Sequence, residues 1–406
     1  MHTRRAHHKS RNGCEQCKVR RVKCDEVYPC LHCVKRGMDC TFKQRQKTSN
    51  SGERPSKSPD SMPAARRIAS PGGEDAYGSF HARLAEAAFA SQEWSMQDPE
   101  LMHHYTLHTS QSLARRQAMQ DTWQAALPHI AYSYEFLMHG ILALAAVHLA
   151  YLKPERYSRY LTSSRFHIAL GVRSFRRTLL VPSVDNYCAL FGFSSLLMVY
   201  IFAAPVDSER ADPPPGALDT ILDLFRICRG TLVLKPYLPL LAKSPLGPLF
   251  RHEFDISSYQ NIVDIPECAL FEGLHDQLSR LRTLILEIDP TSESCPRTSC
   301  LQALGQLELS FRAILSADLP LECGMIFMWP LTLDEEFLNL VRGKHAVALV
   351  LLSFYCAQLH AFANYWFVGQ RGLELLVEIA QVVPAPLDAW LEWPRRVTGQ
   401  QFHVVS

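Results

Sequence analysis

Six cysteines near the start of the chain have the residue type and the spacing to bind metal. They occur as C-x2-C-x6-C, then five residues, then a second C-x2-C-x6-C, so the two halves have the same internal spacing. Tetrahedral zinc takes four ligands, and each half supplies only three thiolates. Six sulfurs can satisfy two zinc ions only if two of them bridge. The pattern therefore predicts a binuclear cluster held by Cys14, Cys17, Cys24, Cys30, Cys33 and Cys40.

A run of positive charge lies between the second and third of these cysteines. It consists of Lys18, Arg20, Arg21 and Lys23. Residues 1–50 hold thirteen Lys and Arg against four Asp and Glu, whereas the whole chain carries only +2. A short basic helix that zinc holds in place can enter the major groove of DNA. The alternative is a purely structural zinc module, and the density of charge beside the ligands argues against it.

The six-cysteine segment resembles the fungal binuclear zinc-cluster family of transcription regulators. The resemblance implies two Zn²⁺ per chain, with Cys14 and Cys30 as the bridging ligands. Cys17 and Cys24 would complete one zinc site, and Cys33 and Cys40 would complete the other. It also implies a DNA-binding transcription regulator that acts on RNA polymerase II genes in a nucleus, with the transcription machinery as a further partner.

The same resemblance implies that the partner is double-stranded DNA with CGG-like half-sites. It also assigns roles to the basic residues in contacting that DNA. In the family, the residue four positions after the second cysteine reads guanine and is usually Lys. Here it is Arg21, whose guanidinium can pair with guanine O6 and N7, and Arg20 precedes it. Phosphate contacts give affinity without sequence information. We expect them from Lys18, Lys23, Lys35 and Arg36, and more weakly from Lys43, Arg45 and Lys47.

Composition divides the chain into three regions. Residues 1–42 form the zinc-cluster DNA-binding domain. Residues 43–80 are rich in Ser, Pro, Gly and charge, and we expect a disordered linker because they have little apolar surface to bury. Residues 81–406 have the composition of a folded regulatory domain. The first thirteen residues are basic and lack an apolar stretch, so we expect no secretory signal there and reduced cysteines throughout.

The large region is predicted to be all-α, which makes the whole protein mostly α. Segment 132–152 places Leu137, Ile141, Leu144, His148 and Tyr151 on one helical stripe, and its other faces are also apolar. The next segment repeats the pattern and carries arginines off the stripe, to which we assign no ligand role. Further helices are expected at about 182–205, 217–234, 267–288, 299–317 and 334–382.

Two long charge-free runs leave a membrane-associated regulator open as an alternative. Residues 187–206 and 346–370 contain no charged side chain and are long enough to span a bilayer. Both are interrupted by polar residues or glycine, as buried helices of a large domain often are. We favour the core-helix interpretation.

The helical region is similar to regulators of the fungal sterol uptake control type. FLMHGILALAAVHLAYL at 136–152, NYCALFGFSSLLMVYIFA at 186–203 and WLEWPR at 390–395 carry this resemblance. It implies control of sterol, lipid or secondary-metabolite genes. It also implies an alternative in which the helical region binds a sterol-like ligand. A solid core would have the same composition, and we take the solid core as the default interpretation.

No catalytic residue is predicted. The chain lacks G-x-S-x-G, H-E-x-x-H and G-x-x-x-x-G-K-[ST], which leaves a metal-dependent enzyme only as a distant alternative. His139 and His148 are nine residues apart on one helix and are not expected to share a metal. Residues 81–94 are too short for a stable coiled coil, so a homodimer is not required.

Overall fold

The computed structural model describes residues 14–20, 22, 24, 33, 96–204, 216–249, 259, 268–288, 296–317 and 320–399. The chain divides into two compact units, Met1–Ala69 and Ser70–Ser406. The described residues are predominantly helical and contain no strand, as the sequence predicts. The predicted boundaries at residues 42 and 80, and the segment 81–94, lie outside the described ranges.

The first unit contains one short described helix, α1 (Glu15–Val19). Cys14 is its N-cap, and the Lys18 N–H donates to the Cys14 carbonyl at 3.1 Å. The chain then turns, and the Val22 N–H donates to the Cys17 carbonyl at 3.1 Å. Five residues are too few for a helix that is stable by itself, so α1 depends on the groups that pack around its cysteines.

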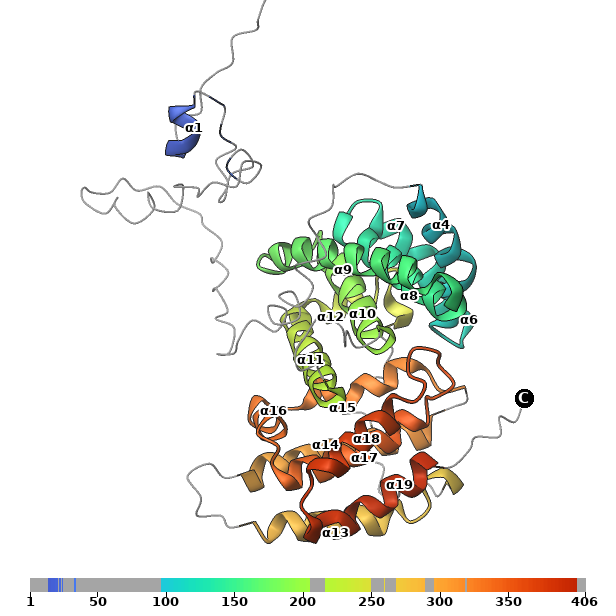
Figure 1. Cartoon of the computed structure of the whole chain (residues 1–406), viewed down its shortest axis with the longest axis vertical. Coiled ribbons are helices and arrows are strands. Elements are labelled where there is room, and N and C mark those ends of the chain that lie inside the picture. The colour runs from blue at the N-terminus through green and yellow to red at the C-terminus, as the bar shows by residue number, and fades with distance from the viewer. Residues whose placement is uncertain are drawn as a thin grey trace, which may run out of the picture. The chain divides into compact units, whose positions relative to one another are not determined.

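The second unit opens with two helical stretches, each of which contains one π-helical turn. The first runs through α4 (Gln97–His104), η3 (Tyr105–Thr109) and α5 (Ser110–Ser112). The second runs through α6 (Gln117–Asp121), η4 (Thr122–Ala126) and α7 (Leu127–Ala131). They pack beside α8, as Figure 1 shows.

Three long helices form the core of this half. They are α8 (Glu135–Leu152), α9 (Tyr157–Leu179) and α10 (Tyr187–Ala203), with the short η5 (Pro154–Arg156) before α9. Small residues let these helices approach closely. A Cβ at Gly140 would lie 2.9 Å from the Phe193 ring, and a Cβ at Gly171 would lie 2.8 Å from the same ring. Phe193 of α10 therefore fills a space that α8 and α9 leave open only because both positions are glycine.

The remaining helices assemble around α17. In chain order the elements are α11 (Ala217–Gly230), η6 (Thr231–Tyr237), α12 (Leu238–Leu241), η7 (Gly247–Leu249), η10 (Ala269–Phe271), α13 (Leu274–Leu286), α14 (Pro296–Ser316), η11 (Cys323–Phe327), α15 (Met328–Thr332), α16 (Glu335–Arg342), α17 (Ala346–His360), α18 (Arg371–Val382), η12 (Ala385–Leu391) and α19 (Glu392–Gly399). Every residue of α17 after the first is buried. Helices α13, α14, α16, α18 and α19 all contact it (Figure 1).

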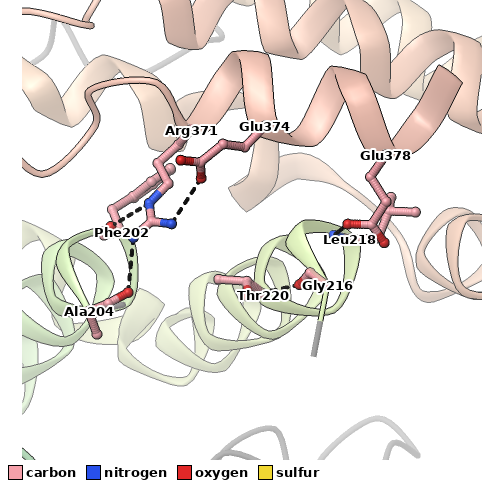
Figure 2. Close-up of polar contacts among 8 residues, drawn as sticks. All are labelled: Phe202, Ala204, Gly216, Leu218, Thr220, Arg371, Glu374 and Glu378. Carbon is pink, nitrogen blue, oxygen red and sulfur yellow. Dashed lines mark hydrogen bonds and ion pairs between the residues drawn. The ribbon is translucent and has the colours of Figure 1, made fainter. Parts of the chain in front are cut away.

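Side chains of α18 hold the facing ends of α10 and α11, as Figure 2 shows. The Arg371 guanidinium donates to the carbonyls of Phe202 and Ala204, both at 3.0 Å, at the C-terminal end of α10. The Glu378 carboxylate accepts the Leu218 N–H at 3.1 Å in the first turn of α11. These two side chains satisfy backbone groups that a helix leaves unpaired at its ends.

Glycine at position 216 permits the second of these contacts. A Cβ built there would lie 2.4 Å from the Glu378 Oε1 atom. The Gly216 N–H also donates to Asp219 Oδ2 at 3.2 Å, in the manner of a capping box. The start of α11 is therefore capped by one carboxylate from its own first turn and by one from α18.

Helix α8 is long and apolar enough to cross a membrane, and 78% of that stretch is buried inside the fold. The pair α16 and α17 passes the same test together, but the two helices are bent by 100° at their junction. Core helices of water-soluble domains meet these criteria as well. The two charge-free runs correspond to α10 and to α17 with the turns after it, and both helices are largely buried.

Three details of the predicted helices are wrong. Tyr151, predicted on the buried stripe, is 58% exposed because it lies in the last turn of α8. Segment 334–382 is three helices rather than one, since the backbone leaves the right-handed helical region at Lys344 (φ 57°) and Gly369 (φ 45°). Helix α13 begins at Leu274 rather than near 267, after Gly273 at φ 75°.

Candidate metal centre and its basic helix

Four of the six predicted ligands lie within the described residues, and the structure brings them together. Cys14, Cys17 and Cys24 are each 2% exposed, and Cys33 is completely buried. The Sγ atoms of Cys14 and Cys33 lie 3.6 Å apart, and those of Cys14, Cys17 and Cys33 all lie within 4.8 Å of one another. The Cys14 N–H donates to Cys24 Sγ at 3.4 Å. The two predicted halves of the cluster therefore meet at Cys14.

This arrangement fits a shared zinc ligand. Two thiolates on one tetrahedral zinc, at the usual Zn–S length of about 2.3 Å, lie about 3.8 Å apart. The Cys14–Cys33 separation is close to that value and far longer than a disulfide bond of about 2 Å. The four cysteines also form a buried cluster of their own, separate from the main hydrophobic core. Cys30 and Cys40 lie outside the described residues.

Helix α1 turns its cysteines inward and its basic residues outward. Cys17 is buried, while Lys18, Val19, Arg20 and Val22 are exposed, with Val19 at 80%. A surface that carries two cations and remains open can contact a polyanion. The predicted contact residues Arg21, Lys23, Lys35, Arg36, Lys43, Arg45 and Lys47 lie outside the described residues.

Residues 12–49 match the fungal Zn(2)-Cys(6) binuclear cluster domain. The chain therefore contains a zinc-cluster domain of this type, and curated relatives that it matches are named Zn(2)-C6 fungal-type transcription factors. A domain of this type binds two zinc ions and implies DNA binding. When bound, the two metal ions would offset most of the charge of six thiolates, so the zinc-cluster domain stays strongly basic.

Curated relatives extend the similarity beyond the zinc-cluster domain. A Zn(2)-C6 fungal-type transcription factor from Gibberella zeae is 26% identical over 98% of this chain and 87% of its own length. The Aspergillus fumigatus transcription factor afumD is 33% identical over 37% of this chain and 36% of its own length. Sterol uptake control protein 2 from Candida albicans is 58% identical over 73% of this chain. The chain spans 40% of that protein, and so covers well under half of two of these three relatives.

Four buried histidines of the helical domain lie in two separate pairs. His139 Nδ1 and His167 Nδ1 lie 3.0 Å apart, and His167 Nε2 lies 3.3 Å from Asp98 Oδ1. His148 Nδ1 lies 3.3 Å from His104 Nε2. His139 and His148 thus have different partners.

Burial sets the protonation of these imidazoles. It lowers the pKa of His148 to about 3 and those of His104 and His167 to about 4, because a buried positive charge loses its hydration. Neighbouring histidines lower these pKa values further. All three are therefore neutral at pH 7, where one nitrogen of each ring donates and the other accepts.

A surface hollow of about 500 Å³ lies on η4 and its neighbours. Its lining is formed by Asp121, Thr122, Ala125, Ala126 and His129. A carboxylate, a hydroxyl and an imidazole make this lining partly polar. The hollow lacks the enclosed apolar wall that would bury most of a sterol.

Sequence reasoning found the cysteines because the whole motif is local. It did not find Arg371, Glu378 or the histidine partners. These contacts join residues from 28 to 169 positions apart, which no local spacing reveals.

Proposed function

We propose that this chain is a sequence-specific, zinc-dependent DNA-binding transcription regulator that acts on RNA polymerase II genes in a fungal nucleus. The observation that carries the proposal is the buried cluster of four cysteines beneath the exposed Lys18 and Arg20. A metal-fixed helix with cations on its open side can lie in a DNA groove. The relatives are transcription factors, and we assign no catalytic residue.

The proposed cofactor ligands are the six cysteines of the motif. Cys14 and Cys30 bridge the two zinc ions, Cys17 and Cys24 complete one site, and Cys33 and Cys40 complete the other. The proximity of Cys14 to both Cys17 and Cys33 supports this assignment. Residues 1–42 serve as the DNA-binding domain, 43–80 as the linker and 81–406 as the regulatory domain.

The proposed DNA contacts divide into base reading and phosphate binding. Arg21 reads guanine in a CGG-like half-site, with Arg20 beside it. Lys18, Lys23, Lys35 and Arg36 bind phosphates, and Lys43, Arg45 and Lys47 add weaker phosphate contacts. Lys18 and Arg20 are both exposed, which leaves these two side chains free to contact DNA.

Control of sterol or lipid genes is the pathway that the relatives favour. Two of them, from Candida albicans and Saccharomyces cerevisiae, are named sterol uptake control protein 2. Direct binding of a sterol-like ligand by the helical domain is the alternative mechanism. It predicts that a sterol raises the thermal stability of the protein in proportion to RT ln(1 + [L]/Kd), whereas a solid core predicts no change.

The test of DNA recognition begins with selection of a preferred duplex from random sequences by the zinc-loaded protein. Affinity is then measured for matched and scrambled duplexes at several salt concentrations. Arg21→Ala is expected to cost about 1–3 kcal/mol on the matched duplex and to reduce discrimination. Lys18→Ala is expected to weaken both duplexes alike and to reduce the salt slope by about one. Equal loss on both duplexes for Arg21→Ala would reject its base-reading role.

A further inference from the structure

The turn between α9 and α10 exposes three aliphatic side chains within five residues. Leu180 is 82% exposed, Val181 71% and Val184 66%. Single exposed apolar residues are ordinary on protein surfaces, but neighbouring ones form a patch that marks an interaction site. Contact of these three apolar side chains with water is unfavourable, and no part of the described fold covers them.

Hydrogen bonds inside the turn hold its backbone in place. The Ser183 N–H donates to Asn186 Oδ1 at 2.8 Å, and Asn186 Nδ2 donates to the Val181 carbonyl at 3.0 Å. The Asp185 N–H donates to Ser183 Oγ at 3.3 Å. Asn and Ser side chains that bond to nearby backbone are typical of well-defined turns. The three apolar side chains are therefore attached to a backbone of fixed conformation.

Two tyrosines from other elements fix the turn to the body of the domain. The Tyr134 hydroxyl donates to the Asp185 carbonyl at 2.5 Å, and the Tyr237 hydroxyl donates to the Pro182 carbonyl at 2.9 Å. The Tyr237 ring also stacks on Tyr187 with an interplanar angle of 11°. A surface held in this way loses little conformational entropy when a partner binds.

Positive charge continues this surface along α9. The helix has five arginines and no acidic residue over its 23 residues. Arg173 and Arg177 precede Leu180 by seven and three positions, so the three side chains share one side of the helix. Neither arginine forms an ion pair with the described part of the chain. A cation in the last turn complements the helix dipole, which accounts for Arg177 but not for Arg173, two turns from the end.

We propose that Arg173, Arg177, Leu180, Val181 and Val184, named the α9 platform, form a docking surface for an acidic amphipathic helix of a partner protein. The apolar face of such a helix would cover the three aliphatic side chains. Its carboxylates would lie over Arg177 and Arg173, about one and two helical turns from Leu180. This interaction is separate from DNA binding by the zinc-cluster domain.

Asp185 makes the two ends of the α9 platform differ in charge, and it favours a peptide over a membrane as the binding partner. Its exposed carboxylate lies directly after Val184, at the apolar end. A carboxylate that enters a bilayer beside the aliphatic residues would be costly. A peptide avoids this cost by placing its acidic residues at the arginine end, where the charges attract.

The test uses a fluorescein-labelled, 18-residue helical peptide of Leu, Ala and Glu, with Leu on one face and Glu flanking it. Binding to the full-length, zinc-loaded protein is followed by fluorescence anisotropy. Control peptides have Lys in place of Glu, or the same composition in scrambled order. We expect the acidic amphipathic peptide to bind and both control peptides to bind at least about tenfold more weakly.

Variants then locate the binding surface. Leu180→Asp combined with Val184→Asp, and separately Arg173→Glu combined with Arg177→Glu, should each weaken binding at least about tenfold. Val377→Asp, at a 51% exposed position on α18, is the matched control and should leave binding unchanged. Tryptophan fluorescence during urea unfolding checks that each variant is folded. Absence of peptide binding, or equal binding by all variants, would overturn the proposal. So would a platform-dependent interaction with phosphatidylserine vesicles or duplex DNA in place of the peptide.

Discussion

At the scale of single residues, Cys14 has the most consequential position in the zinc-cluster domain. It is the N-cap of α1, its backbone contacts the Cys24 sulfur, and its sulfur lies beside Cys33. Each neighbour belongs to a different part of the motif. A bridging thiolate is the role that these three contacts suit.

Replacement of Cys14 should therefore disturb both metal ions. We expect Cys14→Ser to abolish stoichiometric binding of two zinc ions, because serine cannot supply a bridging thiolate and the domain folds on its metal. Native mass spectrometry of the full chain measures the zinc count. Cys188→Ser, at a half-buried position in the helical domain, is the control and should retain two zinc ions. Two zinc ions in Cys14→Ser would show that this sulfur does not bridge.

At the scale of elements, α18 stabilises the fold through helix ends as well as through its apolar face. Arg371 makes two charge-assisted hydrogen bonds to carbonyls of α10 and pairs with Glu374 at 3.0 Å (Figure 2). The guanidinium is half-buried, so water cannot replace all of its hydrogen bonds to the α10 carbonyls when the side chain is removed.

Truncation of Arg371 should accordingly lower the free energy of unfolding. We expect Arg371→Ala to cost about 1–3 kcal/mol, because two carbonyls at the end of α10 lose their donors. Arg395→Ala is the matched control, since Arg395 pairs with the exposed Asp388 among the described residues and its loss should cost under about 1 kcal/mol. Urea unfolding followed by tryptophan fluorescence compares the two. Equal losses would mean that the α10 contacts add little.

Local sequence patterns predict α8, α9 and α10 because each is long and strongly apolar on at least one face. The breaks within 334–382 are less visible. Lys344 adopts the left-handed region that usually requires glycine, so composition does not mark that turn clearly. The caps from α18 could not be predicted, since Arg371 acts on residues 167 and 169 positions away. The zinc motif, by contrast, fits within 27 residues and needs no fold to be recognised.

At the scale of the whole molecule, the buried histidines make the stability of the helical domain depend on pH. Folded His104, His148 and His167 have pKa values of about 3–4, while an unfolded histidine titrates near 6.5. Below about pH 6.5 the unfolded state therefore binds more protons than the folded state. Stability from these groups is complete above that pH and is lost as pH falls towards 4.

We expect the free energy of unfolding to fall by up to about 4 kcal/mol per pH unit near pH 5, where all three histidines differ in protonation. Urea midpoints between pH 7.5 and 4.5, followed by tryptophan fluorescence, measure this slope. All six tryptophans lie after residue 90, so the signal reports the helical domain and not the zinc cluster. His148→Gln should reduce the slope by about a third, whereas His129→Gln, at an exposed position, should not change it. A flat profile would show that these imidazoles are not neutral in the folded state.

The close approach of Gly216 to Glu378 has a consequence for which substitutions evolution tolerates at these two positions. A methyl group at position 216 would lie 2.4 Å from the Glu378 Oε1 atom, so Gly216→Ala should push this flexible side chain aside and break its hydrogen bond to the Leu218 N–H. Glu378→Ala removes the same hydrogen bond, so the double variant should be about as stable as either single variant. The effects of substitutions at two codons 162 positions apart would then fail to add. In natural populations, a larger residue at the first position should be tolerated mainly in lineages that have already lost the glutamate.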